Sequence, residues 1–309
     1  MLNRKKISCF GEVLWDIFPS GKSAGGAPFN VAYHLNKLGH EVSAISRVGT
    51  DDLGTELLKQ IKDWNIPQSF IQLDQKHPTS TVKAVFDVNN DAEYIFEDNV
   101  AWDYIEVDEK IRKKVASSDA FVFGSLITRS EASRNSLFEL LEISKLNIFD
   151  INFRPPHYSL EVIRKILYKC HVFKLSKSEL RLLLEFLKKD YTDEYESCKF
   201  LQETFGIPEI IITKGSKGAV YYNNSNFYNF PVVPVKIGDT IGSGDAFLAG
   251  FISKKLENAT AEDSMEQAIS LGAFVTSKIG ACPPYSLPEF ISFKKQNKDQ
   301  FQNHNSLII

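Results

Sequence analysis

The chain has 309 residues, of which 43% are hydrophobic and 24% charged, and its formal net charge is −3. These values are typical of a globular protein with a sizeable core, in one large α/β domain or in one domain with a small addition. Because the net charge is slightly negative and the sequence has no long basic run, we expect no nucleic-acid partner.

The cysteines and the apolar segments indicate the cellular compartment of the protein. Four cysteines lack the spacing of metal ligands and are typical of reduced thiols in a cytoplasmic protein: Cys9, Cys170, Cys198 and Cys282. The apolar run near the N-terminus is interrupted by Gly11 and Glu12, so it does not fit a signal peptide. No apolar run is long enough to cross a bilayer. We therefore expect a cytoplasmic protein without a membrane partner.

The N-terminal part alternates between strands and helices, which is typical of a parallel α/β sheet. Strands are predicted over 7–14 and 41–48, and helices over 29–39 and 53–64. A turn-rich stretch over 19–28 contains the tripeptide Gly21-Lys22-Ser23. This tripeptide does not belong to a Walker A loop, because that motif needs a glycine where the chain has Asp16.

The pattern changes between residues 69 and 98. Segments over 69–73, 81–88 and 93–96 alternate in polarity, and a turn over 89–91 joins the last two. Together with a strand within about 12–20, they predict a small antiparallel sheet inserted into the α/β order. Such a half-exposed sheet serves as a lid or as the surface of a homodimer. The alternative is that these strands extend the main sheet.

The α/β alternation resumes after this insertion. Further strands are predicted over 120–124, 147–154, 171–176 and 210–213, and helices over 133–144, 160–170, 177–188, 194–205 and 264–279. The stretch over 293–309 is polar and is predicted to be a frayed tail. Because there is no repeat and no linker, residues 1–309 are expected to form one doubly wound, mostly parallel α/β domain.

The glycine turn Gly242-Ser243-Gly244-Asp245 is the strongest candidate site. It follows an extended apolar run over 230–235 and opens a helix over 246–252. The start of a helix leaves backbone N–H groups without partners and favours an anion, commonly a phosphate. Asp245 adds a carboxylate there, which suits a base in phosphoryl transfer. The alternative is ordinary helix capping by Asp, Ser and Gly.

Other polar residues follow the ends of predicted strands, where ligands bind in open parallel sheets. They are Asp16, Asn152, Arg154, Glu179, Thr213, Gly215 and Gly218. Each has a plain structural alternative. Asp16 could cap a turn and Arg154 could be a surface charge. Glu179 could complete a capping box with Ser176. The agreement of these positions with the glycine turn favours a common site.

Two motifs resemble signatures of the ribokinase-like, or PfkB, carbohydrate kinases. They are Gly25-Gly26-Ala27-Pro28-Phe29-Asn30 and Asp239-Thr240-Ile241-Gly242-Ser243-Gly244-Asp245. The resemblance runs from Ile7 to Pro288 and includes the order of strands, helices and lid. Within the family, the segments over 99–105 and 150–155 are most similar to bacterial fructokinases. Ser176 and Ser243 depart from the usual family residues, but neither change removes a catalytic group.

The resemblance implies roles at the acceptor end of the site. Asp245 would take the proton from a primary hydroxyl of a sugar. The backbone N–H groups of Gly242, Ser243 and Gly244 would hold the transferring phosphoryl group in an anion hole. The residues expected to bind the sugar are Asp16, Gly25, Gly26, Asn30, Phe96 and Arg154. The alternative role for Arg154 is to neutralise phosphate charge.

At the other end, the resemblance implies ATP and Mg²⁺ as cofactors. Asn152 and Glu179 would belong to the magnesium and phosphate network, mostly through water. The other residues expected to border the nucleotide are Lys177, Thr213, Gly215, Gly218, Ala268, Gly272 and Gly280. The backbone of Asp239 and Ile241 could bind K⁺, which the sequence leaves open because carbonyl ligands leave no trace in it.

The expected function is an ATP-dependent kinase that converts D-fructose to fructose 6-phosphate. Alternative acceptors are ribose, 2-keto-3-deoxygluconate and a nucleoside. A non-catalytic sugar or nucleotide sensor on the same fold is a function of another class, but a sensor has no need of Asp245. A dinucleotide-binding oxidoreductase is disfavoured because no Gly-x-Gly-x-x-Gly follows the first strand.

Overall fold

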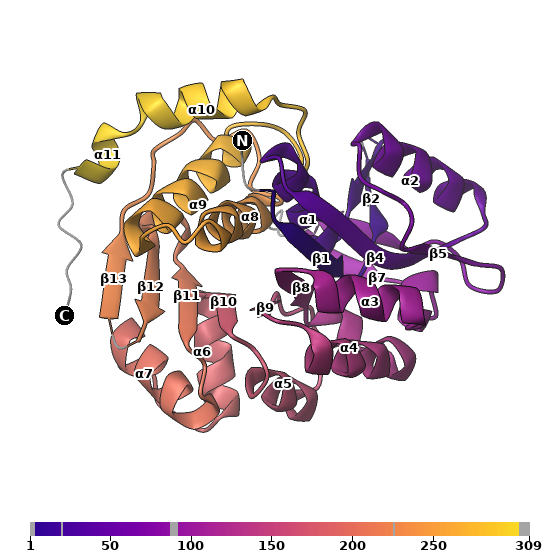
Figure 1. Cartoon of the computed structure of the whole chain (residues 1–309), viewed down its shortest axis with the longest axis horizontal. Coiled ribbons are helices and arrows are strands. Elements are labelled where there is room, and N and C mark those ends of the chain that lie inside the picture. The colour runs from indigo at the N-terminus through magenta and orange to yellow at the C-terminus, as the bar shows by residue number, and fades with distance from the viewer. Residues whose placement is uncertain (1–3, 20, 87–91, 225, 303–309) are drawn as a thin grey trace.

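A computed structural model describes residues 4–19, 21–86, 92–224 and 226–302. In these residues a nine-stranded main sheet has the order β13-β12-β11-β10-β9-β8-β1-β4-β5 (Figure 1). The strands from β11 to β5 run parallel, and β12 runs antiparallel to both of its neighbours, β11 and β13. The bounds are Lys6–Phe10 (β1), Glu41–Gly49 (β4), Ile71–Asp74 (β5), Ala120–Gly124 (β8), Asn147–Asp150 (β9), Val172–Ser176 (β10), Glu209–Thr213 (β11), Ala219–Asn223 (β12) and Asn226–Phe230 (β13).

Helices cover both faces of this sheet (Figure 1). On one face lie Ala27–Lys37 (α1), Asp52–Asp63 (α2), Ser243–Leu256 (α8), Ala261–Thr276 (α9) and Leu287–Gln296 (α10). On the other lie Glu109–Ser117 (α3), Glu131–Ile143 (α4), Leu160–Leu167 (α5), Lys177–Phe186 (α6) and Glu194–Phe205 (α7). Short helices span Ala101–Tyr104 (η1), Leu126–Thr128 (η2), Gly215–Lys217 (η3) and Asp299–Gln302 (α11).

Two hydrophobic cores fill the space between the sheet and its helices. Successive side chains of a strand point to opposite faces, so β1 places Ile7 in one core and Phe10 in the other. In the second core the rings of Phe123, Phe149 and Phe173 stack across three neighbouring strands, with centroids 5.3 and 5.5 Å apart. The predicted doubly wound sheet is therefore confirmed.

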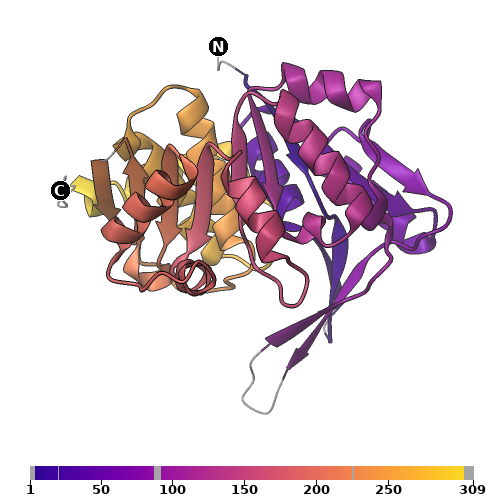
Figure 2. The same ribbon diagram turned by 90° about the horizontal axis from the view of Figure 1, so that it is seen from below.

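A second, smaller sheet stands beside the main one and has the order β3-β2-β6-β7. Its strands are Leu14–Phe18 (β2), Gly21–Gly25 (β3), Thr81–Phe86 (β6) and Ala92–Phe96 (β7). Figure 2 shows the β6–β7 hairpin reaching away from the body of the molecule. The inserted sheet is confirmed, although its central pair, β2 and β6, is parallel. The predicted turn over 89–91 lies outside the described residues, and the role of the sheet as a dimer surface stays a prediction.

The membership of this second sheet differs from the expectation at two strands. The segment over 69–73 was assigned to it wrongly, because β5 pairs in parallel with β4 at the edge of the main sheet. Alternating polarity marks a half-exposed strand but does not say which sheet it joins. Conversely, β3 was predicted as a turn, because Gly21 and Gly25 are typical turn residues.

Several other elements correct the sequence interpretation. The strand predicted over 147–154 ends at Asp150, and β13 ends at Phe230, where the extended run was predicted to begin. Within the predicted tail over 293–309, α10 ends at Gln296 and α11 spans Asp299–Gln302, and residues 303–309 lie outside the described residues. Strands β12 and β13 and helix α3 were not predicted.

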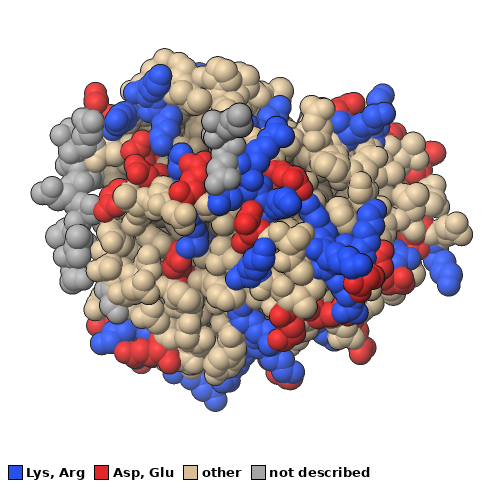
Figure 3. Space-filling view, in the orientation of Figure 1, with Lys and Arg blue, Asp and Glu red and all other residues tan. Residues whose placement is uncertain are grey.

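The charges on the surface and the length and polarity of the helices are consistent with the composition of the chain. On the face shown in Figure 3, basic and acidic side chains are intermixed. Within the described part of the chain, no helix combines the length and the apolar character needed to cross a membrane.

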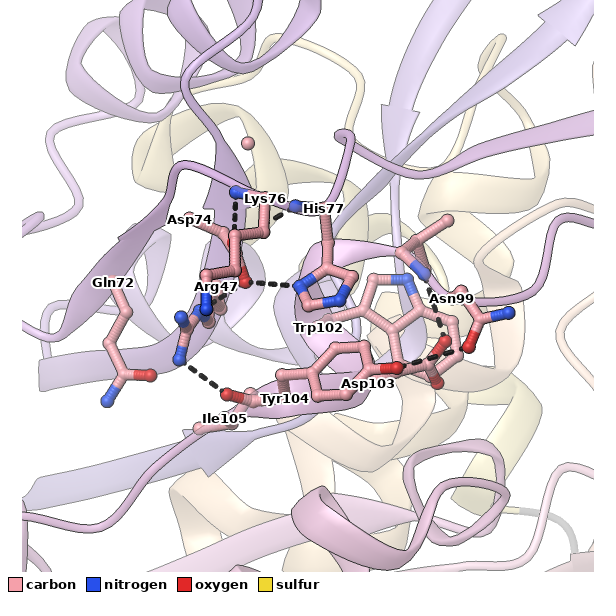
Figure 4. A network of polar contacts seen from close by, with 12 residues as sticks. Arg47, Gln72, Asp74, Lys76, His77, Asn99, Trp102, Asp103, Tyr104 and Ile105 are labelled. Carbon is pink, nitrogen blue, oxygen red and sulfur yellow. Dashed lines mark hydrogen bonds and ion pairs between the residues drawn. The ribbon is translucent and has the colours of Figure 1, made fainter.

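A polar network clamps helix η1 between Arg129, which follows η2, and Arg47 of β4. Figure 4 shows the side of this clamp that Arg47 forms. Asp103 forms a two-pronged ion pair with Arg129, with N–O distances of 2.8 and 2.7 Å. The guanidinium of Arg129 also lies 4.0 Å from the ring centroid of Trp102. On the other side of η1, Arg47 donates to the carbonyl oxygen of Tyr104 at 2.7 Å. Because η1 follows β7 in the chain, this network fixes the segment that returns from the small sheet.

Replacing Arg129 by methionine tests this clamp. The Asp103 and Arg129 side chains are 5% and 6% exposed, so the variant leaves a buried carboxylate without its partner and should lose about 3–5 kcal/mol of unfolding free energy. The control is Arg112→Met, whose ion pair with Glu139 is 43% and 35% exposed and should contribute less than about 1 kcal/mol. Urea unfolding measures both. Equal losses in the two variants would contradict the clamp.

Candidate active site

A cavity of about 340 Å³ opens at the carboxyl ends of the central strands. It brings together residues from the small sheet, the start of α1, the ends of β8 to β10 and the turn before α8. Of the residues predicted to form the acceptor site, it contains Asp16, Gly26, Asn30, Phe96, Arg154, Gly242, Gly244 and Asp245, and it also contains Asn152, which was predicted for the magnesium and phosphate network. Residues that lie more than 200 positions apart in the sequence therefore form one site.

The glycine turn begins helix α8 without a side-chain cap from its N-cap residue. Gly242 is the N-cap residue, with φ of 72°, and a Cβ there would lie 2.6 Å from the Cα of Ala281. Ser243 donates through Oγ to the carbonyl oxygen of Thr240 at 2.7 Å. The capping alternative therefore does not explain Asp245, which lies in the first turn of α8 and makes its contact elsewhere. The helix start is oriented to receive an anion.

Asp245 is buried and accepts a hydrogen bond from Asn30 of α1. The distance from Asn30 Nδ2 to Asp245 Oδ2 is 2.8 Å, and Asp245 is 9% exposed. The pKa of Asp245 is raised to about 6, because burial and then the charge of Asp150 raise it more than Lys174, Asn30 and Arg154 lower it. A carboxylate with a pKa close to the working pH is suited to act as a general base.

The loop after α9 holds α1 in place beside the turn. Cys282 donates through Sγ to Asn30 Oδ1 at 3.3 Å, which orients the amide so that Nδ2 faces Asp245. Burial lowers the pKa of His34 to about 4, so its ring is neutral at pH 7. Its Nε2–H donates to the carbonyl oxygen of Ala281 at 2.9 Å, because a carbonyl only accepts. The hydroxyl of Tyr285 lies 3.1 Å from Nδ1 and donates to it.

Three charged residues of this cavity, Glu12, Asp150 and Lys174, were not predicted to form the site. Lys174 of β10 and Asp150 of β9 form an ion pair of 2.6 Å, with side chains 8% and 6% exposed. A Cβ placed on Gly244 would lie 3.4 Å from Lys174 Nζ, so the ammonium group is close to the glycine turn. The sequence signal for this ion pair was a lysine between Phe173 and Leu175 in an apolar strand. Lysine is rarely fully buried unless it is paired, so its position indicates a partner of opposite charge.

Asp16 extends into the cavity from β2. Its pKa is raised to about 6, because burial raises it more than the charge of Arg154 lowers it. A Cβ on Gly25 would lie 2.3 Å from Asp16 Oδ2, so the glycine leaves room for the carboxylate without lining the cavity itself. Gly26 has φ of 117° and lies so close to Glu12 that a Cβ would be 2.3 Å from its carbonyl oxygen.

A second cavity, of about 520 Å³, adjoins the first at the glycine turn. The two share Thr240 and Gly244. The second cavity contains four of the predicted nucleotide residues, Thr213, Gly215, Gly218 and Gly272. Ser243 lies at this side of the turn.

Two other residues that were expected to border the nucleotide lie elsewhere. Ala268 is fully buried where α9 packs on α8, and its Cα would lie 2.9 Å from a Cβ on Gly250. Gly280 lies outside both cavities, and its N–H donates to Asp239 Oδ2 at 3.1 Å. The other oxygen of Asp239 accepts from the N–H of Ile241 at 3.0 Å. Asp239 thus ties the turn to the loop that follows α9.

The two predicted residues at the start of α6 have structural partners. Glu179 completes a capping box with Ser176, as the alternative interpretation stated. Its oxygens accept from the backbone N–H groups of Phe153 and Ser176 at 3.0 and 2.7 Å. Lys177 pairs with Glu194 at 2.6 Å, and neither Lys177 nor Glu179 lines the two cavities. In the described ranges, no three His, Cys, Asp or Glu side chains form a group that could hold a metal ion.

Comparisons with known proteins agree on one family. The model of the pfkB family carbohydrate kinases matches residues 3–288. The chain is 27% identical to probable fructokinase-3 of Arabidopsis thaliana, over 96% of this chain and 93% of the relative. It is also 27% identical to a fructokinase of Salmonella typhimurium, over 89% and 94% of the two chains.

Solved structures share the fold. A fructokinase with bound ATP from Xylella fastidiosa has a TM-score of 0.84 at 20% identity and covers 96% of this chain and 99% of its own. A fructokinase from Vibrio cholerae O395, with fructose, ADP and a calcium ion bound, has a TM-score of 0.81 at 23% identity, over 94% and 98% of the chains.

A pair of alanine variants tests the close packing of the turn. Gly242 and Gly280 have similar φ values, 72° and 80°, but only Gly242 faces a neighbour, whereas a Cβ on Gly280 meets nothing within 4 Å. Gly280→Ala should lower the unfolding free energy by about 1 kcal/mol, the cost of a left-handed backbone. Gly242→Ala should lose a further ~1–3 kcal/mol from overpacking against Ala281. Urea unfolding measures the unfolding free energy of both variants. Equal losses in the two variants would show that the turn has room to move.

Proposed function

This chain belongs to the pfkB family of carbohydrate kinases and is a phosphotransferase that acts on a sugar hydroxyl; we propose that it transfers the γ-phosphoryl group of ATP to the C6 hydroxyl of D-fructose. One observation carries the proposal. Asp245, a buried carboxylate with a pKa of about 6, lies at the turn where the two cavities meet. The sugar occupies the first cavity and ATP the second.

In the proposed reaction, Asp245 accepts the proton of the attacking hydroxyl. The sugar oxygen then forms its bond to the γ-phosphorus while the bond from this phosphorus to the bridging oxygen of ADP breaks. The N–H groups of Gly242, Ser243 and Gly244 stabilise the charge on the transferring group, as preorganised donors do in anion holes. The Lys174 ammonium, close to Gly244, offsets the same charge.

The residues around the turn fit a magnesium ion held mainly by the nucleotide. Mg²⁺ commonly binds through one or two carboxylates, waters and substrate phosphates, so it needs no three-residue protein cluster. Asp150, whose buried Oδ1 has no hydrogen-bond partner in the described part of the chain, would hold its waters together with Asn152 and Glu179. The ion neutralises phosphate charge when bound. A potassium site at the backbone of Asp239 and Ile241 stays a prediction.

Fructose is proposed as the acceptor because the curated relatives at 27% identity include fructokinases from a plant and a bacterium. The first cavity also offers the polar groups that a sugar requires. Asp16 and Asn30 supply a carboxylate and an amide for hydroxyl groups, and Arg154 supplies a cation. The other acceptors, ribose, 2-keto-3-deoxygluconate and a nucleoside, are outcomes of the test.

A sugar panel with ATP and magnesium measures the acceptor, with ADP release as the signal. D-Fructose should give a kcat/KM at least about 10-fold above that of ribose, 2-keto-3-deoxygluconate and a nucleoside, because misplaced hydroxyls leave buried polar groups unpaired. Turnover with another acceptor and none with fructose would reject the fructose assignment and leave the kinase assignment intact.

The pH dependence of kcat/KM and the variant Asp245→Asn test the base. The base acts when it is deprotonated, so its raised pKa predicts that kcat/KM falls below about pH 6, whereas an ordinary aspartate titrates near pH 4. Asp245→Asn should reduce kcat by about 10²–10⁴-fold. Its melting temperature at pH 7 should be unchanged or higher, because the substitution removes a charge that burial disfavours. Retained activity in a folded Asn variant would refute the mechanism.

A further inference from the structure

Glu12 is a buried carboxylate in the first cavity to which the sequence motifs assign no role. It lies in the short connection between β1 and β2 and is 4% exposed. It lines the cavity together with Asp16, Asn30 and Asp245. Its position among these groups raises the question of what its carboxylate contacts.

One side of Glu12 is fixed by the start of α1. Its Oε1 accepts a hydrogen bond from the N–H of Ala27, the first residue of α1, at 3.1 Å. Gly26, the N-cap residue, provides no side-chain cap, and its backbone packs closely on that of Glu12. Glu12 therefore supplies the cap from a distant loop, and this contact holds its carboxylate in one orientation.

The other oxygen has no such contact. Oε2 of Glu12 is buried and has no hydrogen-bond partner among the residues described. The pKa of Glu12 is raised to about 7, because burial, together with the charge of Asp245, raises it more than backbone N–H groups and Arg154 lower it. Buried acceptors are paired in nearly all proteins, so an unpaired one on a residue that lines a cavity indicates a donor supplied by a ligand.

We propose that Glu12 is an acceptor-binding residue, whose Oε2 accepts a hydrogen bond from one sugar hydroxyl other than the hydroxyl that is phosphorylated. The inference rests on the proposed position of the sugar in the first cavity. Because the carboxylate is fixed before the sugar arrives, it selects for a hydroxyl at one position of the ring or chain. A role restricted to capping α1 would use Oε1 alone and would require no contact with the sugar.

The experiment is a cycle that combines Glu12→Gln with removal of single hydroxyls from the sugar. Glutamine keeps a carbonyl oxygen for the N–H of Ala27 and replaces Oε2 by an amide group that donates. The variant should raise KM for the parent sugar by about 10-fold or more, with kcat within a few-fold of wild type, because one hydrogen bond to the substrate is lost. One monodeoxy analogue should cost the wild-type enzyme a similar factor and cost the variant nothing further.

The control makes the same carboxylate-to-amide change at another helix start. Asp108 caps α3 through the N–H of Ile111 at 2.7 Å and lies outside both cavities. Asp108→Asn should therefore keep the wild-type kcat and KM. This control separates the loss of a sugar contact from the general effect of weakening a helix cap.

A wild-type KM in Glu12→Gln, or additive losses with every deoxy analogue, would overturn the proposal. If Glu12→Gln does not fold, as judged by its melting temperature, Glu12→Asp takes its place, because it withdraws the carboxylate by one methylene group. Failure of the fructose assignment is a separate result. It would appear as absent fructose turnover in the wild-type enzyme, and the cycle would then use the sugar that this enzyme phosphorylates.

Discussion

The burial of the Asp245 carboxylate is the constraint on which the site depends. Removing an ionised carboxylate from water is unfavourable, so burial raises its pKa. Nearby hydrogen-bond donors and cations lower the pKa again. Asn30 donates directly to Asp245, and Lys174 and Arg154 add positive charge. These three groups limit the rise of the Asp245 pKa to about 6. Stronger pairing would leave too weak a base, and weaker pairing would keep the group protonated at neutral pH.

The features predicted correctly from the sequence are those whose signals are local. The alternation of strands and helices gave the parallel sheet, and the turn from Asp239 to Asp245 carries its glycines and its carboxylate within one short stretch. The ion pair of Asp150 and Lys174 could not be predicted in this way. It depends on the register in which β9 lies opposite β10, and this register places the two residues side by side.

Ala268 and Glu179 lie outside the two cavities and share a physical explanation: one residue type serves two purposes. Ala268 and Gly272 are one helical turn apart, and small side chains suit both close helix packing and a nucleotide wall. The structure uses Ala268 for the packing of α9 on α8 and leaves Gly272 in the second cavity. Glu179 shows the same ambiguity, because a glutamate three residues after Ser176 completes a capping box whether or not it also serves a ligand.

The contact between Asn30 and Asp245 joins positions 215 residues apart. During synthesis, the N-terminal strands and α1 leave the ribosome long before α8 and the loop from Ala281 to Tyr285. Until α8 docks on α1, Asp245 lacks its partner Asn30. The desolvation of this carboxylate therefore accompanies the docking of α8, which the hydrophobic packing of α8 favours.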